Sequence, residues 1–216
     1  MKKILLSLFV VLFMTLAFSR AEATCTYPWS TLTTYFNTGS PDSCEIAVKY
    51  CFKTSLTGDY YDIYLDTAFV ANPPCGTFDS TYISNLYPKI INAICQDLLI
   101  GGLLYPCNSE HQKVQVTFTK AFCWKFHNYP TGPFGGGGYL AFIPCEDVGY
   151  CIWVYKLCVN TDIPGHYFVE KELISIDYSE GNNQCQSITP TIPPIGHLWN
   201  DEWETDCFSI SCELDN

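Results

Sequence analysis

The amino-acid sequence predicts a mainly β protein with one α-helix and a framework of disulfide bonds. Several segments alternate apolar and polar residues with the period of two that is typical of a half-buried strand. One segment between them repeats its apolar residues at helical spacing. All 13 cysteines follow an N-terminal leader typical of export. We expect the strands to form a β-sandwich-like body or two related antiparallel β-units.

Residues 1–23 are predicted to be a secretory signal peptide. Lys2 and Lys3 precede an almost continuously apolar run from Ile4 to Phe18, and Ala21-Glu22-Ala23 fits a small-x-small cleavage site. An uncleaved anchor is the alternative, but about 15 apolar residues fall short of the roughly 20 that cross a bilayer. We therefore expect a secreted or cell-surface protein that does not span the membrane after cleavage.

The chain is acidic, with 22 Asp and Glu residues against 11 Lys and Arg and a formal net charge of −11. Residues 24–216 contain no arginine, so they lack the guanidinium fork that grips phosphates and guanine bases. This charge would repel nucleic acid. Nucleic-acid binding is therefore excluded as a function class, whereas extracellular proteins and glycans remain as partners.

The cysteines are expected to form a disulfide framework. A metal site is the alternative, but no two cysteines have the C-x-x-C spacing of a zinc knuckle. The odd number leaves one thiol that is free or bonded to another chain, and Cys95 is the candidate for it. The expected disulfide cysteines, with their pairing left open, are Cys25, Cys44, Cys51, Cys75, Cys107, Cys123, Cys145, Cys151, Cys158, Cys185, Cys207 and Cys212.

Two segments carry the clearest strand pattern. In CEIAVKYCFKT the predicted buried face consists of Ile46, Val48, Tyr50 and Phe52. In KVQVTFTKAFCWKF it consists of Val114, Val116, Phe118, Phe122 and Trp124. Both segments end in an aromatic, a cysteine, an aromatic and a lysine, which favours a duplicated β-unit at 44–75 and 107–145. A chance likeness between two short strands is the alternative.

Residues 87–100 are predicted to form the helix. Pro88 suits its first turn, and Gly101-Gly102 ends it. The apolar stripe that we expect to pack on a sheet consists of Ile90, Ile91, Ile94 and Leu98. Cys95 flanks this stripe, so we expect a buried thiol that is inert.

The segment from Gly135 to Val159 is predicted to be a hairpin that the chain enters through a slack glycine loop. A strand follows the four glycines and no lysine follows them until Lys156, so a phosphate cradle is not expected. Residues 146–149 are the expected turn. Cys151 and Cys158 cannot bond each other in a regular strand, because seven residues span about 23 Å. A further strand is predicted from His166 to Ile176.

Residues 24–176 are thus expected to be a disulfide-stapled β domain, and residues 177–216 a loop-rich tail tethered by cysteines. Aromatic and acidic residues gather in the tail segment HLWNDEWETD, which is the candidate binding segment. It is an exposed recognition segment, a weak calcium site or a solvated acidic loop. The solvated loop is favoured over the calcium site, because the segment lacks the Asp-x-Asp-x-Asp-Gly spacing of a calcium loop. The candidate binding residues are Trp199, Asp201, Trp203, Glu204 and Asp206.

Catalytic signatures are missing from the sequence. It has no G-x-S-x-G elbow, no H-E-x-x-H and no protease-like cysteine motif. We therefore predict a non-enzymatic protein with a structural, adhesive or ligand-binding role and, calcium apart, no cofactor. The alternative is a secreted hydrolase that acts on glycans through a pair of carboxylates. An exposed strand edge, or a free cysteine on the exterior, would favour assembly into an oligomer.

Overall fold

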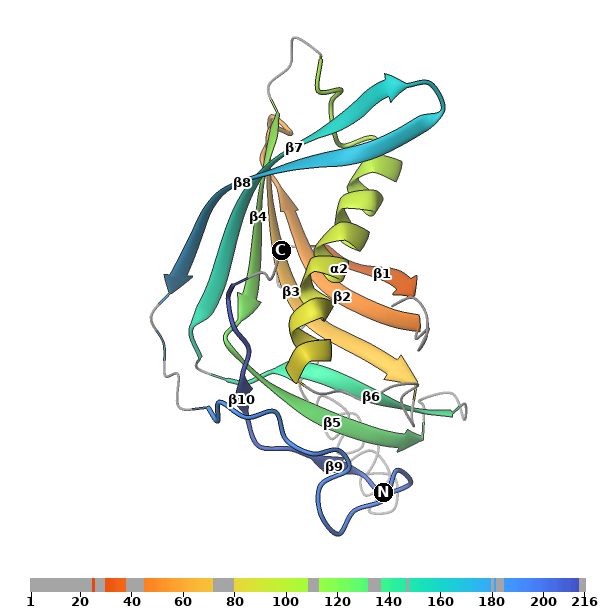
Figure 1. The fold of residues 1–216 in the computed structure, drawn as a ribbon, viewed down its shortest axis with the longest axis vertical. Coiled ribbons are helices and arrows are strands. Elements are labelled where there is room, and N and C mark those ends of the chain that lie inside the picture. The colour runs from red at the N-terminus through yellow and green to blue at the C-terminus, as the bar shows by residue number, and fades with distance from the viewer. Residues whose placement is uncertain are drawn as a thin grey trace, which may run out of the picture.

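The computed structural model describes residues 25, 30–37, 45–71, 80–108, 113–131, 137–146, 148–179, 181 and 185–213. In these residues ten strands form one mixed sheet, and one helix lies across a face of it (Figure 1). The prediction of a mainly β, disulfide-rich fold with one helix is confirmed. Its strands form a single sheet with one parallel pair, so the sheet is not divided into two stacked layers. The predicted signal peptide lies outside the described residues.

The first three strands form an antiparallel meander. β1 (Ser30–Asn37) pairs with β2 (Glu45–Thr54), and β2 pairs with β3 (Tyr60–Ala71). The turn between β2 and β3 contains Gly58 at φ 76°, a left-handed conformation that glycine adopts without strain. The predicted buried face of β2 is confirmed, because Ile46, Val48 and Tyr50 are buried and Phe52 packs on the core.

The sheet forks at β3. One part of its free edge pairs in parallel with β4 (Val114–Ala121), as far as Tyr64. The other part pairs antiparallel with β6 (Gly137–Pro144), from Ala68 onward. Because two strands share one edge, they diverge beyond it.

Each side of the fork carries further strands. β4 pairs with β7 (Tyr150–Ile163), which pairs with β8 (His166–Ser179), and we call this set the β4–β7–β8 branch. β6 pairs with β5 (Cys123–Thr131), and we call these two the β5–β6 branch. The chain crosses from one branch to the other at Phe122, between β4 and β5.

The helix α2 (Ser80–Ile100) is the crossover that makes β3 and β4 parallel. The predicted range 87–100 is too short, because the helix begins at Ser80 and Pro88 lies inside it. A proline inside a helix costs about 3 kcal/mol. Burial of a large aliphatic side chain contributes roughly 1.5–3 kcal/mol, and both Ile83 and Leu86 are buried in the added turns. Packing on the sheet therefore extends the helix past a local stop signal.

The end of α2 agrees with the prediction. The N–H of Leu103 donates to the carbonyl of Leu98, and the N–H of Gly102 donates to the carbonyl of Leu99, both at 3.0 Å. This pair of bonds is a Schellman motif, which needs a left-handed residue. Gly102 supplies it at φ 67°.

Residues 185–213 join the two branches. β9 (Trp203–Glu204) and β10 (Phe208–Ser209) both pair with β5. The segment then leaves the β5–β6 branch, and Cys212 is bonded to Cys151 on β7 of the other branch. We call residues 208–213 the strap. In Figure 1 it runs from β10 toward α2.

The segment predicted to be a loop-rich tail is therefore part of the sheet and of the core. Phe208 and Ile210 are buried, so the predicted boundary at residue 176 does not separate a core from an appendage. The expected tethering by cysteines is observed. Besides the bridge to Cys212, the segment carries Cys123–Cys185 and Cys145–Cys207.

The remaining described bridges are Cys25–Cys51 and Cys107–Cys158. Cys151 and Cys158 thus have different partners, as strand geometry requires. Among the described cysteines Cys95 is the free one, and it is buried. Cys44 and Cys75 lie outside the described residues.

The prediction that residues 139–159 form a hairpin is wrong. β6 pairs with β3 and β5, whereas β7 pairs with β4 and β8, so the two strands lie in different branches. On β7 the alternate residues are buried: Cys151, Trp153, Tyr155, Leu157 and Val159. The duplication of 44–75 in 107–145 stays a prediction: Cys51 lies inside one continuous strand, whereas Cys123 begins a new strand after a break.

In the part of the chain that the structure describes, no helix has the length and apolar character needed to cross a membrane.

The burial of Cys95 predicts that its thiol is inert in the folded protein. Burial raises the pKa of Cys95 to about 12, so the reactive thiolate is scarce at neutral pH. We expect iodoacetamide to leave the Cys95 peptide unmodified in the native, unreduced protein and to modify it after unfolding in guanidinium. Mass spectrometry of the digested protein measures both. Rapid native labelling of this peptide would contradict the packing of α2.

Candidate functional site

The two tryptophans of the predicted binding segment are packing residues. Trp203 is buried, and its indole N–H donates to the carbonyl of Leu198 at 3.1 Å. Trp199 is half-buried and packs on Trp203, with 5.5 Å between the ring centroids. The hypothesis of an exposed recognition segment is therefore wrong for Trp203. The strand pairing of β9 with β5 turns this side chain inward.

The acidic residues of the same segment do not converge. Asp201 accepts a hydrogen bond from the N–H of Leu198 at 2.8 Å. Glu204 pairs with Lys125 at 2.8 Å, and this hydrogen bond lowers the pKa of the Glu204 carboxyl. Asp206 accepts a bond of 3.4 Å from Gln186.

These contacts favour a structural role for the three carboxylates over calcium binding. One group of three metal-ligand side chains lies within 4.8 Å in the described residues, and it consists of Cys107, Cys158 and Glu170. Its two sulfurs are joined in a disulfide. The calcium alternative for Asp201, Glu204 and Asp206 thus gains no support.

A buried lysine, which the sequence interpretation missed, lies at the fork. The core face of β4 alternates through Val114, Val116 and Phe118, and the next position on that face is Lys120. All four side chains are 0% exposed. The period of two could have revealed this lysine, because it places Lys120 on the same face of the strand as three core residues.

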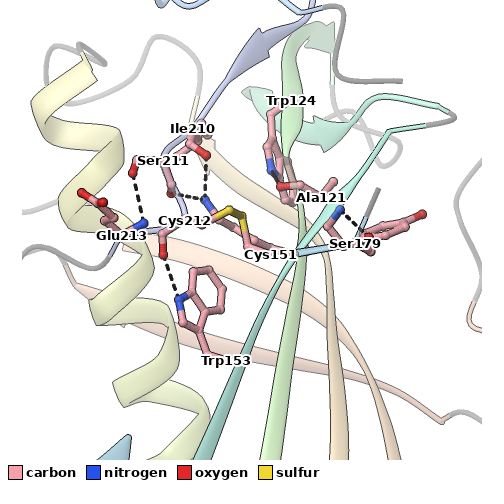
Figure 2. The surroundings of a disulfide bond; sticks show 11 residues. Ala121, Trp124, Cys151, Trp153, Ser179, Ile210, Ser211, Cys212 and Glu213 are labelled. Carbon is pink, nitrogen blue, oxygen red and sulfur yellow. Dashed lines mark hydrogen bonds between the residues drawn. A yellow bond between two sulfur atoms is a disulfide. The ribbon is translucent and has the colours of Figure 1, made fainter. Parts of the chain in front are cut away.

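The Lys120 ammonium is surrounded by acceptors. It donates to the carbonyl of Ser211 at 2.9 Å and to that of Ile210 at 3.4 Å (Figure 2). It also lies 3.9 Å from the centroid of the Tyr87 ring and 5.5 Å from that of Trp153. Carbonyl oxygens and aromatic faces both stabilise a cation. Burial opposes them and lowers the pKa of Lys120 well below its usual range.

Two further contacts hold the strap beside Lys120. The Cys151–Cys212 disulfide bonds it to β7, and the Trp153 indole N–H donates to the carbonyl of Cys212 at 2.9 Å (Figure 2). The strap is thus fixed at three successive residues, Ile210, Ser211 and Cys212. These contacts hold the strap against the β4–β7–β8 branch.

A cleft of about 450 Å³ lies outside the strap. It is bounded by α2 at Ile83, by the crossover residue Phe122, by Tyr178 near the end of β8 and by the strap. Its described lining is rich in hydroxyl groups and carries one carboxylate, that of Glu213. This is a ligand-sized concave site within the described residues.

A second surface lies along β8. Within the described residues this strand pairs with β7 alone, so its outer edge is the edge of the sheet (Figure 1). Five of its large apolar side chains are exposed: Tyr167, Phe168, Leu173, Ile174 and Tyr178. We call this strand edge, with its apolar side chains, the β8 edge.

Comparisons of the chain with protein-family models, with curated proteins and with solved structures find no match. The cleft and the β8 edge are therefore the observations from which function is argued.

The burial of Lys120 predicts a pH-dependent effect of Lys120→Met on stability. An unfolded lysine keeps its proton up to about pH 10, while the folded protein releases it at lower pH because burial lowers the pKa. Between these values the unfolded state binds more protons, so the stability of the wild type rises with pH. We expect its free energy of unfolding, relative to Lys120→Met, to increase as the pH rises toward about 10, by at most about 1.4 kcal/mol per unit.

Urea denaturation at a series of pH values measures this difference. Lys156→Met is the matched control, because Lys156 is an exposed lysine on β7, and its difference from the wild type should stay flat. A difference for Lys120→Met that is flat or falls with pH would contradict a buried titrating amine.

Proposed function

We propose that this chain is an exported, non-enzymatic binding protein that adds an extended segment of a protein partner to its β8 edge. One observation carries the proposal: β8 is a 14-residue edge strand with exposed apolar side chains. An edge strand presents unpaired N–H and C=O groups, which a strand from another chain can pair with. Apolar side chains next to them supply affinity beyond the backbone bonds.

The charges of β8 do not protect this edge. Natural edge strands are often guarded by lysines and other charged side chains. Here Lys171 donates a hydrogen bond to Asn92 on α2, and Glu172 pairs with Lys113 at 3.0 Å. Glu170 accepts a bond of 2.6 Å from Asn160 on β7. The three central charges are engaged within the chain, which leaves the apolar side chains as the main exposed feature.

The side chains of β8 also continue the core face of the sheet. Leu173 and Tyr178 lie opposite Tyr155 and Cys151 of β7, whose side chains face the core. Leu173 and Tyr178 are exposed, whereas Ile176 on the same face packs on the core. An added strand with apolar residues on this face would extend the core by one strand.

The edge is rigid, which favours binding. β7 and β8 share a long antiparallel register from Tyr150 to Ile163, and Cys107–Cys158 fixes β7 to the segment before β4. A preorganised edge loses little conformational entropy when a partner binds. The five described disulfides agree with an extracellular site of action.

The hydrolase alternative has less support. A glycosidase needs two carboxyl groups on opposite sides of a bound sugar, about 5–10 Å apart. Among the described residues that line the cleft, Glu213 is the one with a carboxylate. This lining fits a binding site better than a carboxylate pair.

A displayed library of random peptides tests the proposal. We expect the wild type to enrich peptides with alternating apolar residues and Leu173→Lys/Ile174→Lys to bind them at least about tenfold more weakly, because lysines oppose strand addition. Ile195→Lys is the control, since Ile195 is 99% exposed but lies away from β8. Fluorescence polarisation measures affinity, and thermal melts show that the variants are folded. A library without enriched peptides, or equal binding by both variants, would contradict the proposal.

A further inference from the structure

The cleft beside the strap is a second site, which shares Tyr178 with the β8 edge. We infer that it binds a neutral carbohydrate unit, one or two sugar rings in size. Three features of the cleft favour such a ligand: the polar side chains of the strap, the hydroxyl groups that face the cleft and the charge of the lining.

The strap has the period of two of an extended segment. Phe208, Ile210 and Cys212 are buried against the two branches. The alternate residues Ser209, Ser211 and Glu213 are more exposed and line the cleft, which Ile210 and Cys212 also border. Alternate residues of an extended chain lie roughly 6.5–7 Å apart, so the strap sets out a row of polar groups across the length of a small sugar.

Several of the cleft's hydroxyl groups are available to a ligand. Within the described residues, those of Ser187, Thr189 and Ser209 form no hydrogen bond with the protein. A serine or threonine hydroxyl both donates and accepts, which matches a sugar, whose hydroxyl groups do the same. Tyr178 and Phe122 add apolar surface to the wall, on which the C–H face of a sugar ring can lie.

The charge of the cleft selects against anions. Lys120 is near, but its ammonium is on the inner side of the strap and is bonded to the carbonyls of Ile210 and Ser211. The charged group of the described lining is Glu213, in a chain with a formal net charge of −11. A carboxylate accepts strong hydrogen bonds from ligand hydroxyl groups, whereas it repels phosphate or carboxylate ligands.

The site is also preformed, as small-molecule sites usually are. Cys123–Cys185 anchors the chain two residues before Ser187. The N–H of Ser209 donates to the carbonyl of Gln186 at 2.7 Å, and the N–H of Ile210 donates to that of Phe122 at 3.1 Å. These contacts tie three of the walls to one another.

The test uses the full oxidised chain and four probes, the methyl glycosides of glucose, galactose, mannose and N-acetylglucosamine. We expect saturation-transfer difference NMR to detect binding of at least one of them, with a Kd on the order of 1 mM. Tyr178→Ala and Glu213→Gln should each weaken that binding about tenfold, through loss of the apolar wall and of the charged acceptor. Tyr167→Ala is the matched control, because Tyr167 and Tyr178 are 60% and 62% exposed on the same strand.

Two outcomes would overturn the inference. The first is that none of the four glycosides binds; binding of putrescine in their place would then make the cleft a cation site built on Glu213. The second is that Tyr178→Ala and Tyr167→Ala weaken glycoside binding by the same factor. Leu173→Lys/Ile174→Lys should keep its glycoside binding, so a failure of the β8 edge proposal is distinguishable from a failure here.

Discussion

The fork at β3 is the constraint on which the rest of the structure depends. A strand edge that pairs with β4 and then with β6 sends two branches apart, and the opening between them must be filled and tied. Tyr87 from α2, Trp124 from β5 and Trp153 from β7 meet there, with ring centroids 6.0 and 6.4 Å from that of Tyr87. The strap pairs with β5 through β10 and is bonded covalently to β7 through Cys212. Without the strap, this aromatic cluster would lose one of its walls.

Lys120 places a polar group where the strap crosses between the two branches. An apolar residue at the same place would leave the carbonyls of Ile210 and Ser211 without the donor that they have in the core. A buried lysine is costly by itself, but it fixes the strap in one register, because the ammonium meets two consecutive carbonyls above an aromatic ring. These contacts hold the strap in the position that the structure shows. The row of side chains facing the cleft depends on that position.

Local patterns in the sequence predict many elements of this fold. The predictions that were wrong concern contacts between segments far apart in the chain. The alternation in β2 and β7, the glycine stop of α2 and the free Cys95 follow from neighbouring residues alone. The start of α2 does not, since burial of Ile83 against the sheet outweighs Pro88. The segment around Trp203 looks solvated in sequence, because its pairing partner β5 lies far back in the chain. The cleft is assembled from α2, Phe122, β8 and the strap, so no single stretch of sequence reveals it.

The spacing of the three bridges to residues 185–213 has a consequence for biosynthesis. The two cysteines of each bridge are 62, 62 and 61 residues apart in the chain. Cys123 lies in β5, Cys145 directly follows β6, and Cys151 lies in β7. A polypeptide is made from its N-terminus, so Cys123, Cys145 and Cys151 emerge as reduced thiols that wait for partners. Oxidation in the native pattern therefore reports that translation has passed Cys212. A product that ends before Cys185 would lack the partners of all three cysteines.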